Sequence, residues 1–254
     1  MPPSVPALPW LAPEQDFPPG AQAWGRESPA PGLLAAGGSL DVDSLRRAYS
    51  AGVFPWFSRN EPILWWSPDP RMVLQTAQFK LHHSLRKTLA RFRRDARCEV
   101  RFDSAFSTVI QACSSRERAG QSGTWIGPEM LNAYQALHEA GFAHSVETWV
   151  DGALVGGLYA VSIGQALFGE SMFAHATDAS KIALAALVGF CRSHGMEMID
   201  CQQNTRHLAS LGAAEVRRDA FLAQVAQQLA KAAPLWQFQP HHGEALAAKP
   251  NPQP

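Results

Sequence analysis

The 254-residue chain has few charged residues and no long apolar run. Asp, Glu, Lys and Arg make up 17% of the sequence, below the roughly 25% of ordinary globular domains, and the formal net charge is zero. No segment approaches the roughly 18 consecutive apolar residues that a membrane span needs. The N-terminus lacks the basic start and apolar segment of a secretion signal. We therefore expect a cytoplasmic globular protein without membrane association.

Several common site signatures are also missing. The four cysteines show no paired spacing, which indicates reduced thiols, and the nine histidines form no HExxH or similar pattern. We therefore expect no metal site. The sequence contains no GxSxG elbow, no Walker A motif and no GxGxxG after a strand, which argues against α/β-hydrolases, P-loop enzymes and dinucleotide-binding proteins. Nothing in the sequence indicates a bound cofactor, and we expect none.

Proline is scarce in the middle of the chain, where Pro128 is the single proline between residues 71 and 233. Because an interior proline costs a helix about 3 kcal/mol, this stretch should hold most of the regular structure. Strand-like runs, including a hairpin signal at Asp151-Gly152, alternate with helical patterns, which predicts a mixed α/β (α+β) fold. The expected organisation is an irregular proline-rich segment (1–31), the remainder of a small N-terminal domain (32–77), a larger domain (78–235) and a disordered tail (236–254).

Zero net charge hides a basic segment. Residues 71–118 carry eleven Lys and Arg against four acids, a net charge of +7, so the rest of the chain is about −7. The sequence FKLHHSLRKTLARFRR predicts an amphipathic helix whose exposed face carries Lys87, Arg91 and Arg94, with Arg86 flanking them. A solvated surface helix is the alternative, but the near absence of acids on this face favours phosphate binding.

Three polar residues lie in otherwise apolar strand-like segments. Asp200 and Gln202 should share one face of a strand, where a carboxylate and an amide can hold an amine and stabilise an oxyanion. Glu170 lies among large apolar residues and is costly to bury without a partner or a task. The alternative for Asp200 is a strand-end residue that caps the next helix. Trp56 and Trp125 lie next to turn residues, where an exposed ring can stack on a base.

A set of motifs then indicates a family. AYSAGVFPWFS, PILWWSPDPR, GTWI, FGESMF, ASKIALAAL and IDCQ, in this order over roughly residues 32–222, closely resemble the leucyl/phenylalanyl-tRNA–protein transferase family. The resemblance implies an enzyme that moves Leu or Phe, with Met as a further candidate, from aminoacyl-tRNA to the N-terminal α-amine of proteins that begin with Arg or Lys. Its products are marked for degradation by the N-end rule pathway. It also implies a small N-terminal domain followed by an acetyltransferase (GNAT)-like domain.

The same resemblance implies roles for individual residues. Asp200, Gln202 and Glu170 match the catalytic segments, whereas Trp56 and Trp125 match the tryptophans that contact the 3′-terminal adenosine of the tRNA, with Tyr49 nearby. From the corresponding segments, Met172, Leu184 and Ile199 are the candidates for the pocket of the aminoacyl side chain. We expect aminoacyl-tRNA and the acceptor protein as partners and a monomeric enzyme.

Three rival functions remain to be weighed. An acetyl-CoA-dependent N-acetyltransferase would need a glycine-rich pyrophosphate loop at a helix start, and HATDASKIALAAL contains no glycine. A non-catalytic RNA-binding module would explain the basic helix but would leave the IDCQ and FGESMF segments without a role. An aminoacyl-tRNA-dependent transferase with a different acceptor stays open on the sequence alone.

Overall fold

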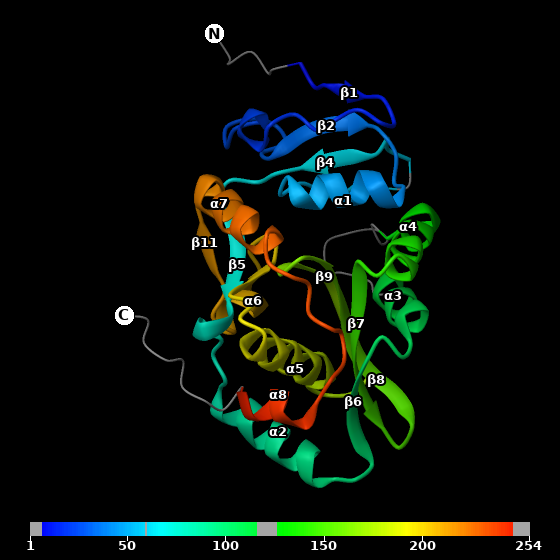
Figure 1. Cartoon of the computed structure of the whole chain (residues 1–254), viewed down its shortest axis with the longest axis vertical. Coiled ribbons are helices and arrows are strands. Elements are labelled where there is room, and N and C mark those ends of the chain that lie inside the picture. Colours follow the sequence, from blue (N-terminus) through cyan, green and yellow to red (C-terminus); the bar gives the residue numbers. More distant parts are fainter. Residues whose placement is uncertain (1–6, 59, 116–125, 246–254) are drawn as a thin grey trace.

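The computed structural model describes residues 7–58, 60–115 and 126–245, and these residues form two β-sheets (Figure 1). The small sheet has the strand order β1 (Trp10–Leu11), β2 (Leu33–Gly37), β4 (Leu64–Trp66), β3 (Phe54–Pro55). The large sheet has the order β11 (Ala214–Val216), β5 (Arg71–Gln75), β10 (Met198–Asp200), β9 (Ala166–Ala174), β8 (Ala153–Ile163), β7 (Ala143–Val150), β6 (Cys98–Phe102). The mixed α/β fold predicted from the sequence is confirmed.

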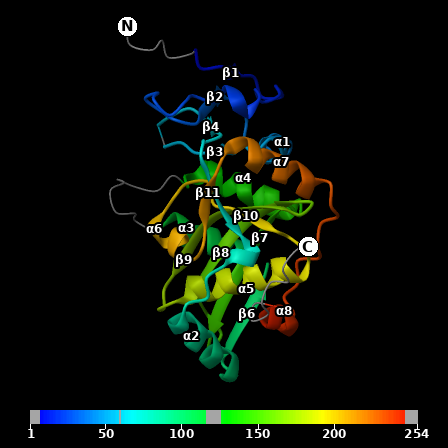
Figure 2. The same cartoon turned by 90° about the vertical axis from the view of Figure 1, so that its left-hand side faces the viewer.

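Helices cover both faces of the large sheet. The α-helices of the described ranges are α1 (Val42–Ser50), α2 (His83–Arg94), α3 (Phe106–Ser114), α4 (Pro128–Glu139), α5 (Ala179–Ser193), α6 (Arg206–Ser210), α7 (Arg218–Leu229) and α8 (Pro240–Ala245), with short 3-10 helices at Gly20–Gln22 and Thr76–Gln78. The apolar α5 packs on one face of β7, β8 and β9, and α3 and α4 pack on the other face. Helices α2 and α8 lie against α5, far from the small sheet (Figures 1 and 2).

The hairpin between β7 and β8 shows how the local sequence selects the structure. Asp151 and Gly152 have φ angles of 50° and 72°, the left-handed backbone that a two-residue turn between antiparallel strands requires. Glycine adopts this region without a steric penalty, and aspartate tolerates it better than most residues. The predicted hairpin is therefore confirmed.

The small sheet and the large sheet share one apolar core. Leu34, Leu45 and Trp65 of the N-terminal part belong to the same buried cluster as Phe106 and Ile110 on α3. A second cluster, on the opposite face of the large sheet, is built around α5. Because the first cluster is continuous, the N-terminal part is held firmly over one end of the large sheet.

Two segment boundaries differ from those expected. The sequence placed residues 71–77 in the small domain, but β5 pairs with β10 and β11 in the large sheet because its apolar run fits a fully buried strand. The expected disordered tail is structured as far as residue 245. Trp236 and Phe238 pack against Phe102. Helix α8 lies on α5, where the absence of a side chain at Gly189 leaves room for the backbone of His242. The tail begins with aromatic residues, and their burial explains why it folds back.

Candidate active site

A cavity of about 870 Å³ opens where the N-terminal part meets β9, β10 and α5. Met172, Leu184 and Ile199 line its apolar side. Glu170 and Gln202 line its polar side. The cavity therefore combines an apolar side with a polar side, on which Glu170 and Gln202 lie together.

Glu170 reaches the cavity because β9 carries a bulge at this residue. Tyr159 of β8 pairs with Ser171 and Ala160 pairs with Gly169, so Glu170 is the extra residue between two paired positions. A bulge interrupts the alternation of side chains and often redirects one of them next to a functional site. The bulge turns the Glu170 carboxylate into the cavity wall.

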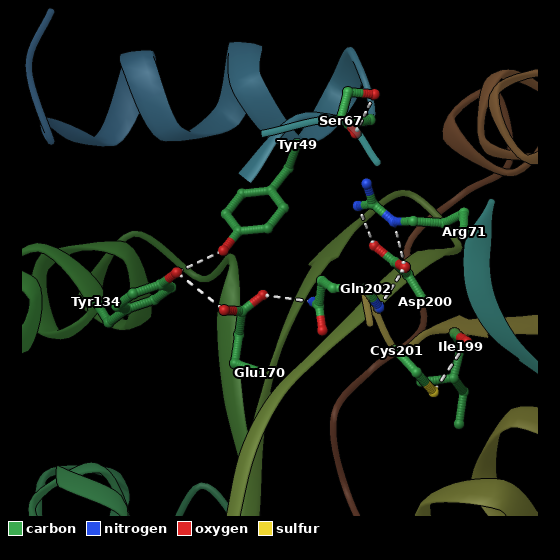
Figure 3. Close-up of polar contacts among 10 residues, drawn as sticks. Tyr49, Ser67, Arg71, Tyr134, Glu170, Ile199, Asp200, Cys201 and Gln202 are labelled. Carbon is green, nitrogen blue, oxygen red and sulfur yellow. Dashed lines mark hydrogen bonds and ion pairs between the residues drawn. The ribbon is translucent and has the colours of Figure 1, made fainter. Parts of the chain in front are cut away.

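The Glu170 carboxylate is the centre of a chain of hydrogen bonds (Figure 3). Tyr134 of α4 donates its hydroxyl to Glu170 Oε2 at 3.0 Å, and the hydroxyls of Tyr49 and Tyr134 are hydrogen-bonded to each other. Gln202 Nε2 donates to Glu170 Oε1 at 3.2 Å. The chain joins α1, α4, β9 and the loop after β10, so both carboxylate oxygens have fixed partners.

Burial changes the protonation behaviour of this carboxyl. Desolvation raises the pKa of Glu170 to about 7, although the hydroxyls of Tyr49 and Tyr134 oppose the shift. The negative charge of Asp200 adds to the increase, and Arg71 opposes it. Burial also raises the pKa of both tyrosine hydroxyls well above 10, so they remain protonated donors. Glu170 is thus suited to exchange a proton near neutral pH.

Asp200 lies behind the cavity wall instead of beside Gln202 on one strand face. β10 ends at Asp200, whose side chain is fully buried and forms an ion pair with Arg71, with 2.6 Å between Oδ2 and Arg71 Nη2. Asp200 Oδ1 also accepts a hydrogen bond from the backbone N–H of Gln202 at 2.9 Å. The expected shared face of a strand is wrong because the chain leaves β10 and enters a turn at Gln202, where φ is +54°.

Cys201 separates these two residues and lines the cavity. Its thiol donates a weak hydrogen bond to the carbonyl of Ile199 at 3.6 Å. Burial and the nearby charge of Asp200 raise the pKa of the thiol far above its ordinary value. A thiol that stays protonated is a poor nucleophile.

The aromatic residues predicted to contact the nucleotide lie in different surroundings. Trp56 is half-buried, lines the cavity just after β3, and packs edge-on against Trp66. Tyr49 is fully buried in the hydrogen-bond chain, and Tyr134 connects it to the cavity residue Glu170. Trp125 lies outside the residues that the structure describes.

The basic residues predicted to bind phosphate lie on the exposed face of α2. Arg86, Lys87, Arg91 and Arg94 are all exposed, and the last three line a shallow depression of about 580 Å³. Within the described ranges, no carboxylate forms an ion pair with any of the four. Thr88 on this helix donates to Asp178 Oδ2 at 3.3 Å, and Asp178 lines the cavity. Helix α2 thus contacts a residue of the cavity lining through Thr88.

Sequence reasoning missed two residues of this site. Arg71 could have been noticed as a charge at the head of the apolar run RMVLQ, which a buried strand tolerates only with a partner. Tyr134 gave no signal, because a tyrosine in an amphipathic helix is ordinarily a core residue.

Among the described residues, no group of three or more His, Cys, Asp or Glu side chains is arranged to hold a metal ion. In the same ranges no helix has the length and apolar character to cross a membrane.

Comparison with known proteins identifies the chain's relatives. Residues 73–226 match the model of the leucyl/phenylalanyl-tRNA protein transferase family, and residues 38–69 match the model of its N-terminal domain. Leucyl/phenylalanyl-tRNA–protein transferases from Polaromonas sp. and Albidiferax ferrireducens are each 64% identical, over 96% and 92% of both chains respectively. The enzyme from Leptothrix cholodnii is 57% identical over 97% of this chain and 98% of its own. Among solved structures, L-PGS from Bacillus licheniformis aligns with a TM-score of 0.37 at 12% identity, over 70% of this chain and 57% of that one.

Proposed function

The chain belongs to the leucyl/phenylalanyl-tRNA–protein transferase family, and we propose that it transfers Leu or Phe from aminoacyl-tRNA to the N-terminal α-amine of proteins that begin with Arg or Lys. The observation that carries this proposal is the carboxylate–amide pair of Glu170 and Gln202 beside an apolar pocket in one cavity. The transfer marks the acceptor for degradation by the N-end rule pathway. Because charged tRNA is a cytoplasmic molecule, the enzyme acts in the cytoplasm.

The donor end of the reaction uses the apolar side of the cavity and α2. The Leu or Phe side chain enters the pocket of Met172, Leu184 and Ile199, while the terminal adenosine stacks on Trp56. The four basic residues of α2, Arg86, Lys87, Arg91 and Arg94, contact phosphates of the tRNA. Trp125 is a second candidate for contact with the adenosine. These contacts fix the ester carbonyl near the polar side of the cavity.

The acceptor end of the reaction uses Glu170. An α-ammonium group has a pKa of roughly 7.7–8.0 and Glu170 has one of about 7, so the proton transfer between them costs about 1 kcal/mol. The ammonium group first gives this proton to Glu170, which releases it to solvent, and leaves a neutral amine with a free lone pair. The ionised Glu170 carboxylate then takes a second proton from the amine nitrogen as that nitrogen attacks the ester carbonyl carbon. As the tetrahedral intermediate collapses, the bond to the 3′-oxygen of the adenosine breaks and Glu170 returns the proton to that oxygen. The ester is already activated, so this route calls for no cofactor.

Gln202 stabilises the charge that develops on the carbonyl oxygen. One N–H of its side-chain amide is used by Glu170 Oε1, and the second is available to the oxyanion. Asp200 contributes by holding the backbone of Gln202 in its turn. Tyr49 and Tyr134 keep the Glu170 carboxylate oriented.

Transfer of radiolabelled amino acid to defined peptides tests the proposal. The full-length protein is incubated with Leu-, Phe- or Met-tRNA and peptides that begin with Arg, Lys, Ala or N-acetyl-Arg. We expect label on the Arg and Lys peptides only, because the N-acetyl-Arg peptide lacks the nucleophilic amine and the Ala peptide lacks the basic first side chain of the proposed acceptors. Intact charged tRNA with no labelled peptide would contradict the proposal. Equal labelling of the Ala, Arg and Lys peptides would instead indicate an acceptor that is not defined by its first residue.

A further inference from the structure

Arg71 is a fully buried arginine at the first position of β5. Its Nε donates to Asp200 Oδ1 at 2.8 Å and its Nη2 donates to Oδ2 at 2.6 Å, so the ion pair is bidentate. The rings of Phe54 and Phe221 cover the guanidinium, with their centroids 4.7 Å and 4.5 Å from Cζ. One side chain therefore contacts β10, β3 and α7.

This placement is costly, which indicates a task beyond stability. The third guanidinium nitrogen, Nη1, is buried and has no hydrogen-bond partner among the described residues. A buried donor without a partner destabilises a fold, and a buried ion pair is often no better for stability than apolar residues of similar volume. If this position contributed to stability alone, an apolar residue would serve as well as Arg71.

The contacts of Arg71 lead to the backbone of Gln202. Asp200 Oδ1 accepts from Arg71 Nε and from the Gln202 N–H, so one carboxylate oxygen joins the two residues. The residue after Arg71 adds two backbone hydrogen bonds to this link. The Met72 N–H donates to the Gln202 carbonyl at 3.3 Å, and the Met72 carbonyl accepts from the Cys201 N–H. This network holds Gln202 at a φ of +54°, a conformation that non-glycine residues adopt at a cost.

We propose that Arg71 is a positioning residue for the transfer reaction: by fixing the Asp200 carboxylate, it holds Gln202 with its side-chain amide against Glu170 and its remaining N–H toward the developing oxyanion. This inference rests on the proposed aminoacyl transfer. Arg71 contacts neither substrate, so its loss slows the chemical step while binding of charged tRNA is preserved. The guanidinium fork is essential because Lys offers a single ammonium that cannot reproduce the two parallel hydrogen bonds.

Four variants test this role: R71K, D200N, R71K/D200N and, as a matched control, R218K. Arg218 lies nearby on α7 and donates to the carbonyl of Ser67, outside the link to Gln202. Thermal melting first establishes that each variant is folded at the assay temperature. We expect R71K to lower kcat at least tenfold, with KM for charged tRNA within threefold of the parent, and R218K to match the parent. In the D200N background, R71K should change kcat less than twofold, because both residues act through one contact.

The possible outcomes separate the inference from the function on which it rests. Parental kcat in folded R71K, a loss confined to KM, or independent effects of R71K and D200N would each overturn the positioning role. If R71K does not fold, F221L replaces it, since this variant removes one ring over the guanidinium and leaves every polar partner in place. A several-fold lower kcat in F221L supports the role, and an unchanged kcat overturns it. An inactive parent protein contradicts the proposed function instead.

Discussion

Glu170 and Gln202 lie side by side because β9 and β10 run parallel in a fixed register. Asp200 pairs with Phe168, so the residues two positions further along each strand direction, Gln202 and Glu170, come together with 3.2 Å between Nε2 and Oε1. The bulge at Glu170 and the left-handed turn at Gln202 direct both side chains to the cavity. The pair thus depends on the register of two strands that are separated by the whole of α5.

The first prediction concerns pH and the rate of transfer. Glu170 must be ionised to accept the proton of the amine, so its contribution to the rate falls tenfold per pH unit below about 7. E170Q should lower the single-turnover rate by about 10²–10⁴-fold. It should also remove the fall in rate below about pH 7 that the Glu170 carboxyl causes. Single-turnover transfer to an Arg peptide between pH 5.5 and 8.5 measures both effects. E215Q is the control, because Glu215 is an exposed carboxylate that contacts Asn204. A parental rate in E170Q at pH 8 would contradict the assignment.

The second prediction concerns stability, which should fall with rising pH where the transfer rate rises. The pKa of Glu170 is about 7 in the folded protein and 4.5 in the reference state. Its contribution to folding is therefore fully present below pH 4.5 and is lost as pH rises through 7. Between pH 4 and pH 8, E170Q should gain up to about 3 kcal/mol of unfolding free energy relative to the parent, since glutamine has no charge to bury. Urea unfolding of both proteins at several pH values measures the difference. Equal pH dependence of the two proteins would show that Glu170 is well solvated.

The sequence predicted the parts of this site that depend on residue type. The apolar lining, the basic face of α2 and the choice of Glu170 and Gln202 as candidate residues follow from motifs and from the cost of burying polar groups. The bulge at Glu170 could not be predicted from the sequence, because a bulge depends on which strand pairs with β9 and in what register. The partner of Asp200 was hidden for a similar reason. Arg71 and Asp200 are 129 residues apart and meet through the antiparallel pairing of β5 with β10, which no local pattern encodes.

The third prediction concerns the basic face of α2. Because each neutralised phosphate releases counterions, the logarithm of tRNA affinity should fall linearly with the logarithm of salt concentration. Replacing Arg86, Lys87 and Arg91 together by alanine should reduce the slope by roughly 2–3. Filter binding of charged tRNA at several salt concentrations measures the slope. R46A is the control, since Arg46 lies on α1 and pairs with Asp43. An unchanged slope in the triple variant would remove α2 from the tRNA contact.

The fourth prediction separates stacking from phosphate contact. W56L should weaken binding of charged tRNA by about 5–150-fold, because stacking of a base on an aromatic side chain contributes roughly 1–3 kcal/mol. The salt slope should stay at the parental value, since no cation is lost. W10L is the matched control, because Trp10 is 70% exposed on β1 and does not line the cavity wall of Glu170 and Gln202. Equal affinity in W56L and the parent would place the adenosine elsewhere.

The last prediction distinguishes direct transfer from a covalent route. Cys201 lines the cavity next to Gln202, so an acyl-enzyme thioester is the obvious alternative to direct attack by the amine. Its thiol is held protonated by burial and by the charge of Asp200, which removes the thiolate that a covalent route needs. C201A should therefore keep kcat within about threefold of the parent, with no label bound to protein after an acid quench in the absence of peptide. A thioester route requires the opposite pair of results, namely an inactive C201A and an acid-stable labelled parent enzyme that discharges to added Arg peptide.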